Sequence, residues 1–151
     1  MTITITTYLQ IDGALVPATE FAGRVADDQY IEGAIDLTVG YKPLLSTEQV
    51  DLVDQLWAYL VDGVGELAAG RAFSTYYPDM PVQIRMTPRG PRVEFAVEAS
   101  KINRRLEVPA DELRTSLLAA ARAFFEGLRA QAPGRADSTE RQLKRIAALG
   151  G

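Results

Sequence analysis

Apolar residues recur along this chain at two spacings, every second position and every three to four positions, and these spacings constrain the fold most. Alternation predicts a strand, because neighbouring side chains of a strand point to opposite faces, and helical spacing predicts an amphipathic helix. Helical spacing covers residues 50–69 and 109–130. Alternation covers residues 2–11, 30–39, 82–87 and 93–99. The predicted order is therefore strand, strand, helix, strand, strand, helix.

Turn residues indicate how the strands pair. Asp12-Gly13 predicts a tight turn after the first strand, and residues 88–91 join two alternating segments into the clearest hairpin. Residues 102–108 add a short strand, although Arg104 breaks its apolar row. Hairpin-connected strands pair antiparallel, and their apolar face needs helices to cover it. We predict a single α+β domain with one antiparallel sheet of four to five strands and two main helices on one face, in ββα-ββα order.

Four residues interrupt the apolar rows. Thr7 is the one gap in the inward row of the first strand, and Gly33 lies on the inward row of the second. A glycine there indicates a bulge or a close packing contact. Gly63 and Gly65 each weaken the first helix by about 1 kcal/mol relative to Ala. We expect them to allow close packing or a bend near its end, and we expect Trp57 to be buried beneath the sheet with Phe124.

The helix ends divide the chain. Residues 46–49 have the Ser-x-x-Gln form of a capping box, which predicts that the first helix follows directly and ends at Gly70. Pro133-Gly134 ends the second helix. We therefore predict a domain over residues 1–132 and a tail over 133–151, which is a linker with a short helix or a flexible end. Because the tail has few apolar anchors, we expect its deletion to leave the melting temperature nearly unchanged.

Composition excludes several classes of site. The chain has no Cys and no His, which excludes disulfides, zinc sites and Ser-His-Asp or Cys-His catalytic arrangements built from this chain alone. No nucleotide-binding, phosphate-binding or hydrolase motif is present. We therefore expect no catalytic residues, no cofactor and no metal. The N-terminal segment lacks the pattern of a signal peptide, and no apolar run is long enough to span a membrane, so we expect a cytoplasmic protein without membrane contact.

Charge is distributed unevenly. Residues 1–69 hold eleven carboxylates and two bases, a net charge of −9, whereas residues 70–151 hold nine carboxylates and fourteen bases, a net charge of +5. Two halves of opposite charge create an electric field that steers charged partners, or the two halves neutralise each other. A homodimer that pairs the acidic half of one copy with the basic half of the other is a third arrangement.

The first helix carries the sharpest candidate site. A helical projection of residues 50–69 places acidic residues opposite the apolar stripe, and no Lys or Arg occurs from 43 to 70. Like-charged neighbours repel, so folding alone gives no reason to keep them. We expect Lys to be tolerated at Asp51 and Asp62. The candidate partner-binding residues are these carboxylates and two nearby tyrosines, namely Glu48, Asp51, Asp54, Asp62, Glu66, Tyr76 and Tyr77.

A second set of residues is basic. Arginines on the second hairpin and the following strand are candidates for anion binding, or they keep an exposed strand soluble. Net charge of −4 argues against a nucleic-acid ligand, which we do not expect. The candidate anion-binding residues are Arg85, Arg89, Arg92, Arg104 and Arg105.

The leading functional hypothesis is non-catalytic protein binding through the acidic helix face. Its partner is a basic protein, and neutralisation of a bacterial toxin by an immunity protein is its most concrete version. One alternative is a small-molecule-binding or isomerase-like enzyme with a pocket between sheet and helices, which requires a carboxylate of shifted pKa in that pocket. The other alternative is the charge-paired homodimer.

Overall fold

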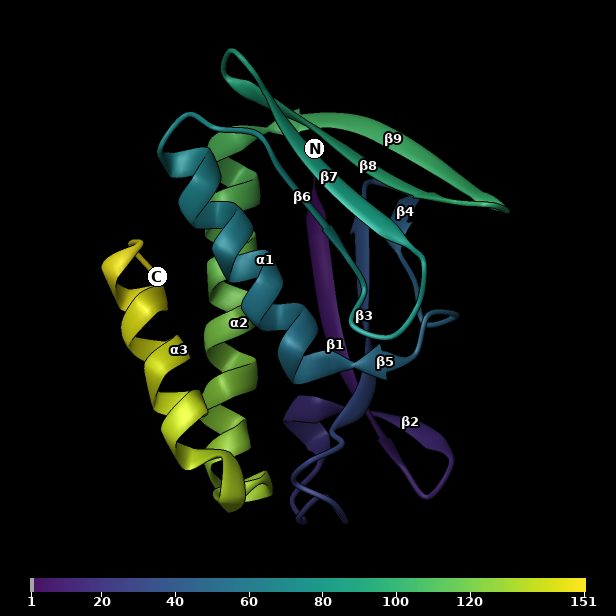
Figure 1. Cartoon of the computed structure of the whole chain (residues 1–151), viewed down its shortest axis with the longest axis vertical. Helices are drawn as coiled ribbons and strands as arrows, with labels where there is room; N and C mark the ends of the chain where they lie inside the picture. The colour runs from purple at the N-terminus through teal and green to yellow at the C-terminus, as the bar shows by residue number, and fades with distance from the viewer. Residues whose placement is uncertain (1) are drawn as a thin grey trace.

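The alternating and helical segments form nine strands and three α-helices in the computed structural model, which describes residues 2–151 (Figure 1). The strands are β1 (Ile3–Ile11), β2 (Ala14–Pro17), β3 (Glu32–Val39), β4 (Lys42–Leu45), β5 (Asp51–Leu52), β6 (Phe73–Tyr76), β7 (Gln83–Arg89), β8 (Arg92–Ala99) and β9 (Ile102–Pro109). The helices are α1 (Val53–Ala68), α2 (Ala110–Gln131) and α3 (Ala136–Ala148), with short 3-10 turns at Ala18–Glu20 and Pro133–Arg135. The predicted α+β class is confirmed, and all strand pairs are antiparallel.

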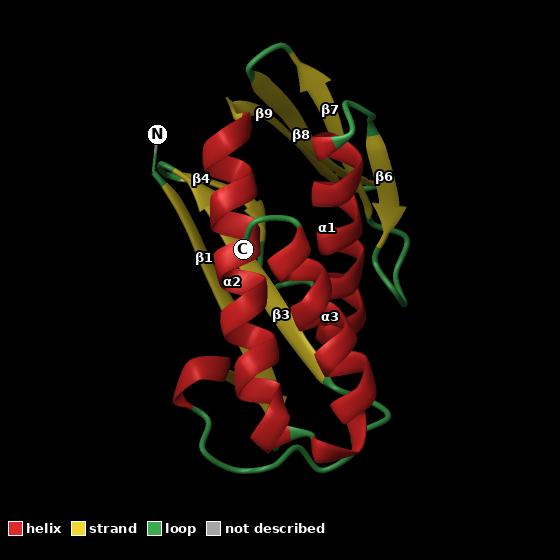
Figure 2. Cartoon of the chain, turned by 90° about the vertical axis from the view of Figure 1, so that its left-hand side faces the viewer, coloured by secondary structure: helices red, strands yellow, loops and turns green. Residues whose placement is uncertain are grey.

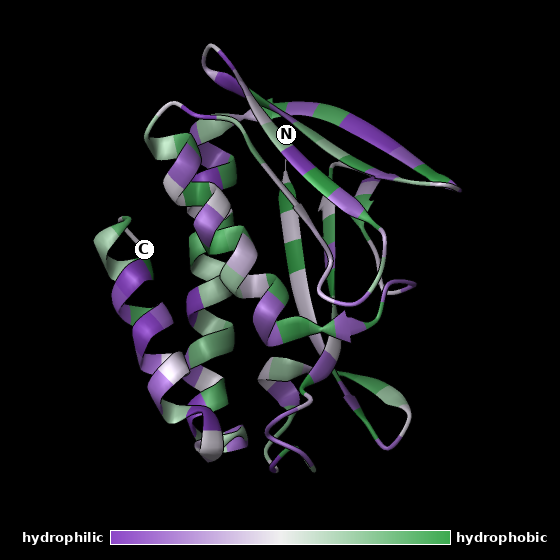
Figure 3. Cartoon of the chain, in the orientation of Figure 1, coloured by the Kyte–Doolittle hydropathy of each residue, from purple (hydrophilic) through white to green (hydrophobic). Residues whose placement is uncertain are grey.

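The strands form two sheets, so the expectation of a single sheet is wrong. Sheet A has the order β2-β1-β3-β4 with β5 paired to β3, and sheet B has the order β6-β7-β8-β9. The physical reason is the burial of α1, which contacts both sheets as well as α2 and α3. A helix that is buried on several sides needs more than one apolar surface around it. Hydropathy alternates along β7 and β8 of sheet B, as expected for strands that are covered on one face (Figure 3).

Sheet A has one face toward the helices and one face away from them. In Figure 2 all three helices lie on the same side of β1 and β3. Paired residues of antiparallel strands share a face, so Thr7 and Ile35 point toward the helices while Thr6 and Asp36 point away. The Asp12-Gly13 turn joins β1 to β2 with positive φ at both residues, as the sequence predicts.

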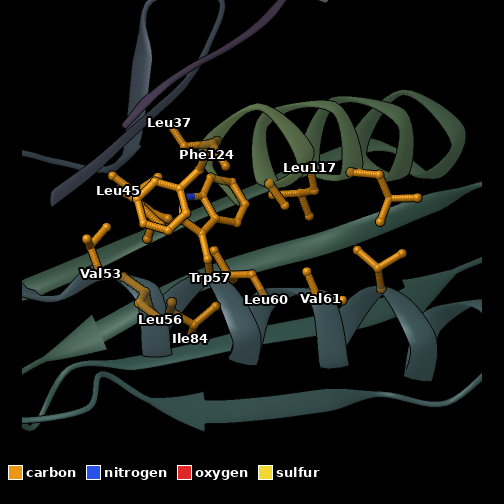
Figure 4. Close-up of a cluster of buried hydrophobic side chains, with 14 of the residues drawn as sticks. Leu37, Leu45, Val53, Leu56, Trp57, Leu60, Val61, Ile84, Leu117 and Phe124 are labelled. Atoms are coloured by element: carbon orange, nitrogen blue, oxygen red, sulfur yellow. The ribbon is translucent and has the colours of Figure 1, made fainter. Parts of the chain in front are cut away.

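Helix α1 is enclosed. Seven of its sixteen residues are buried, and Trp57 and Leu60 have no exposed surface at all. Figure 4 shows side chains of both sheets and of α2 around these residues. Burial of one such large apolar side chain stabilises the fold by about 1.5–3 kcal/mol. The predicted burial of Trp57 is confirmed, and so is that of Phe124, which is 2% exposed.

The interruptions in the apolar rows have structural causes. The hydroxyl oxygen of Thr7 accepts a hydrogen bond from the indole Nε1 of Trp57 at 3.0 Å. A Cβ atom at Gly63 would collide with Met86 and would lie 2.8 Å from Phe73, so its absence allows α1 to approach sheet B. A Cβ atom at Gly33 would collide with the backbone of β1. The predicted close contacts at both glycines are confirmed.

The first helix begins later than the capping box predicts. The hydroxyl of Ser46 donates to Oε1 of Gln49 at 3.0 Å, which closes a turn rather than a helix end. The chain then pairs with β3 through Asp51 and Leu52 before α1 begins at Val53. Strand pairing has overridden the local helix-start pattern, as tertiary contacts often do.

The tail packs against the body of the protein. The expected short helix is present as α3, which packs on α2 and α1, and its Ile146 has no exposed surface. The guanidinium of Arg129 on α2 forms a two-point ion pair with Glu140 of α3, at 2.7 and 3.1 Å. Ile146 anchors the tail in the core, and deletion of the tail would therefore expose core surface.

We predict that Thr7→Val lowers the free energy of unfolding by about 1–3 kcal/mol, because it leaves the buried indole N–H of Trp57 without an acceptor. Thr4→Val is the matched control, since Thr4 is an exposed threonine on the other face of the same strand. Urea unfolding measures both variants. Equal stability of the two variants would show that the Thr7 hydroxyl does not support the core.

Candidate functional site

The acidic residues of α1 have basic neighbours from the second half of the chain. Asp62 forms an ion pair with Arg145 of α3, and the carboxylate of Glu66 accepts from Nε of Arg71 at 2.6 Å. The hydrogen bond with Arg71 holds the pKa of the Glu66 carboxyl below its usual value. These two carboxylates are therefore neutralised by the basic half of the same chain, which is one of the two arrangements that the charge distribution left open. The helical projection could not reveal the pairing because Arg145 lies far away in sequence.

Asp51 is buried rather than solvated. It is 5% exposed, and its carboxylate accepts from the backbone N–H of Leu52 at 2.6 Å and of Asp79 at 3.0 Å. Asp51 belongs to β5, before α1 begins, so the helical projection does not describe the direction of its side chain. It ties the loop after β6 to sheet A. The prediction that Lys is tolerated there assumed an exposed carboxylate, and the burial of Asp51 leads us to expect the opposite.

Tyr77 and Arg104 lie near Asp51 in the interior. Tyr77 is 3% exposed, and its hydroxyl is buried without a hydrogen-bond partner among the described residues. Burial raises the pKa of the Tyr77 phenol well above its usual value, the charge of Asp51 raises it further, and the charge of Arg104 opposes both. The guanidinium of Arg104 donates to the carbonyl of Leu44 at 3.4 Å, which explains why it breaks the apolar row of β9. The structure thus brings together three residues that the sequence assigned to two different surfaces.

Tyr76 and the other arginines lie outside the core. Tyr76 is 57% exposed on the edge strand β6. Cross-strand pairing places Arg85 and Arg105 on either side of Ala96, on the outer face of sheet B. Arg105 forms an ion pair with Glu98 at 3.2 Å. The outer face of sheet B therefore carries both signs of charge.

Two more arginines lie at the ends of the strands of sheet B. Arg89 approaches Glu94 to 3.9 Å, and Arg92 donates to the carbonyl of Glu107 at 3.2 Å. Cross-strand pairing places these two arginines on the same face of sheet B as Arg85 and Arg105. Carboxylates of Glu94, Glu98 and Glu107 lie on that face as well, so it is not purely cationic.

Eight of the fourteen carboxylates that form no ion pair among the described residues lie in residues 2–52. The six ion pairs among the described residues all use carboxylates at or beyond Asp62. None uses the eight carboxylates of residues 2–52. Three of those eight, Asp27, Asp28 and Asp51, accept hydrogen bonds from backbone N–H groups. The other five, which accept no hydrogen bond in the described residues, are Asp12, Glu20, Glu32, Asp36 and Glu48.

Two cavities bear on the small-molecule alternative. A cavity of about 270 Å³ lies where α1, α2 and β8 meet, with Leu67 and Leu113 among its apolar lining and Asp111 and Arg114 among its polar lining. A second cavity of about 240 Å³ lies between the three helices and includes Asp54. Burial raises the pKa of the Asp54 carboxyl, although backbone N–H groups and the charge of Arg135 oppose the shift. The carboxylate of shifted pKa thus lies in the helix cleft rather than between sheet and helices.

We predict that Asp51→Ala lowers the free energy of unfolding by about 1–3 kcal/mol, because two N–H groups lose their buried acceptor. Asp79→Ala removes only an exposed carboxylate and keeps the backbone N–H that donates to Asp51, so it should change stability by less than about 0.5 kcal/mol. Urea unfolding of both variants tests the difference. An Asp51→Ala variant as stable as Asp79→Ala would mean that the buried carboxylate is not structural.

We predict that Asp54→Asn stabilises the protein at neutral pH and that the gain disappears in acid. The folded state raises the pKa of this carboxyl, so its charged form costs stability at every pH above the folded value. As the pH falls through that value, the wild-type carboxyl takes up its proton in the folded state first, and the cost is lost. Unfolding curves from pH 7 to pH 3 measure the effect, with the exposed Asp137→Asn as control; a gain that does not depend on pH would contradict the assignment.

The chain matches no protein-family model, and comparison with curated proteins and with solved structures gives no match either. Within residues 2–151, no helix combines the length and apolar character needed to cross a membrane. The function therefore has to be inferred from the residues of this chain.

Proposed function

We propose that this chain binds a basic protein and that the outer face of sheet A, rather than α1, is the docking surface. The observation that supports this most is the absence of any ion pair at the carboxylates of residues 2–52, beside the internal pairing of those on α1. The proposal keeps the acidic partner-binding function and moves it to another element.

The outer face of sheet A is suited to such a partner. Glu32 and Asp36 project from the same face of β3, because they are four residues apart in one strand. Thr6 is the cross-strand partner of Asp36, and Thr4 and Thr38 face each other beside them. No Lys or Arg occurs in β1, β2 or β3. These three strands therefore carry carboxylates and no base, and Lys42 of β4 is the one base in the strands of sheet A that the structure describes.

An exposed aromatic residue adjoins this face. Tyr30, two residues before Glu32, is 62% exposed. Tyrosine is enriched among residues that anchor protein interfaces, because its ring buries apolar area while its hydroxyl bonds to a polar neighbour. Carboxylates around such an anchor raise the association rate of a positively charged partner and fix its orientation.

Toxin neutralisation is the most specific form of this proposal. Its partner would be a basic toxin domain, and a toxin gene next to the gene for this chain would support it. The charge-paired homodimer has less support, because Arg71 and Arg145 of the basic half already pair with α1 of the same chain.

The test reverses charge on the proposed face and on a matched control. Glu32→Lys with Asp36→Lys should lower the association rate of a basic partner by about tenfold or more in low salt. Asp79→Lys with Glu107→Lys changes the net charge equally at exposed carboxylates outside sheet A that form no ion pair among the described residues. Pull-down from the source organism recovers the partner, and biolayer interferometry then gives the rates.

Two results would overturn the proposal. One is a sheet A variant that binds the recovered partner as fast as the wild type does. The other is an equal loss in both double variants, which would show dependence on net charge rather than on this face.

A further inference from the structure

One side of β1 is unpaired along the N-terminal part of the strand. β3 pairs with residues 3–9 of β1, whereas on the other side β2 pairs only with residues 8–11. Ala18, the residue after β2, lines the same small cavity as Thr7, so the chain leaves this side of β1 there. Residues 3–6 have no second neighbouring strand among the described residues, and we call them the open edge. In Figure 2 this part of β1, nearest the N-terminus, forms the outer border of the molecule.

The main-chain groups of Ile3 and Ile5 point away from β3, toward the open edge. The carbonyl of Thr2 accepts from the N–H of Gly40, the residue after β3, at 2.7 Å. Successive residues of a strand direct their N–H and C=O groups alternately to its two sides. The even-numbered residues of β1 therefore face β3, and Ile3 and Ile5 present donors and acceptors that no described strand receives.

The sequence of β1 lacks the features that normally protect an open edge. Folded proteins discourage strand addition with a charged residue or Pro in the outer strand, or by keeping that strand short. β1 is nine residues long, is rich in β-branched residues and contains no charged residue, Pro or Gly. Such a segment with free main-chain groups favours the addition of another strand. The other outer strands are protected: β2, β4 and β6 have four residues each, β4 begins with Lys42-Pro43, and β9 carries Arg104, Arg105, Glu107 and Pro109.

We propose that a second copy of this chain covers the open edge through an antiparallel β1–β1 pair. With a twofold axis at Thr4, Ile3 of each copy pairs with Ile5 of the other and exchanges main-chain hydrogen bonds with it. The isoleucines of both copies then lie together on the helix side of the joined sheet, and the two Thr4 side chains face each other on its outer side. Residues 2–6 carry no charge, so identical copies do not repel there. The segment is thus complementary to itself in hydrogen bonding, apolar area and charge.

This dimer is distinct from the two arrangements considered above. It uses no ion pair, so it should persist as the salt concentration rises, whereas a dimer held by opposite charges weakens. It joins the sheets through their edges and leaves the outer face of β3 with Glu32 and Asp36 uncovered. Failure of the basic-partner proposal would therefore leave this one intact, and the reverse also holds.

The association of the full chain tests the proposal. Sedimentation equilibrium from micromolar to millimolar concentration, in low and in high salt, should show a monomer–dimer equilibrium in both. Amide hydrogen exchange locates the interface. The amides of Ile3 and Ile5 should become protected as the concentration rises, whereas those of Thr4 and Thr6, which face β3, should be protected at every concentration.

Charge variants test the position of the axis. Thr4→Lys places two like charges opposite each other and should raise the dimer dissociation constant by about fivefold or more. Gln10→Lys adds the same charge at an exposed residue on the same face of β1, where β2 already pairs with the strand, and should leave that constant unchanged. Thr4→Glu alone should weaken the dimer as Thr4→Lys does. An equimolar mixture of the two Thr4 variants should restore it, which would also show that both variants are folded.

Any of four results would overturn the proposal. The first is a wild type that stays monomeric over the whole concentration range. The second is a dimer that dissociates as salt rises, which would assign association to opposite charges. The third is equal weakening by Thr4→Lys and Gln10→Lys, and the fourth is a mixture of Thr4→Lys and Thr4→Glu that stays as weakly associated as each variant alone.

Discussion

The enclosure of α1 is the constraint on which the other elements depend. Sheet A, sheet B, α2 and α3 all contact this helix, and seven of its sixteen residues are buried. Trp57 lies at its centre and needs Thr7 as acceptor, because a buried indole N–H without a partner is costly. Gly63 lowers the intrinsic stability of the helix, but it lets sheet B approach, so packing outweighs helix propensity here.

The same enclosure explains how the charge asymmetry of the chain is arranged. Carboxylates on a packed helix need basic neighbours within reach, and α3 and the loop after α1 supply Arg145 and Arg71. Part of the charge asymmetry is thus neutralised by ion pairs within the chain. Most of the carboxylates that remain lie in residues 2–52, and the outer face of β1 and β3 has no helix over it and no base in these two strands. Repulsion between the carboxylates of such a surface destabilises the isolated protein, whereas the same carboxylates attract a basic partner.

The spacing of apolar residues predicts those strands and helices whose formation depends on local backbone geometry. Alternation and helical periodicity identified four strands and both long helices, and the breaks at Thr7 and Gly33 marked real contacts. The division into two sheets was not predictable, because periodicity shows which residues share a face but not which surface covers that face. Asp51 was misplaced for a related reason: a helical projection describes only helical residues, and Asp51 pairs with Gly33 in a strand. The cleft at Asp54 unites residues of three helices, which no local pattern connects.

Amide hydrogen exchange tests the central position of α1 most directly. If α1 is enclosed by both sheets and two helices, its amides from Leu56 to Val64 exchange only through global unfolding, with the same free energy as denaturant unfolding gives. The amides of α3, which has exposed residues along much of its length, should exchange through smaller openings. Exchange of the α1 amides as fast as those of α3 would contradict this account. It would mean that α1 is a peripheral helix and that its carboxylates are available to a partner.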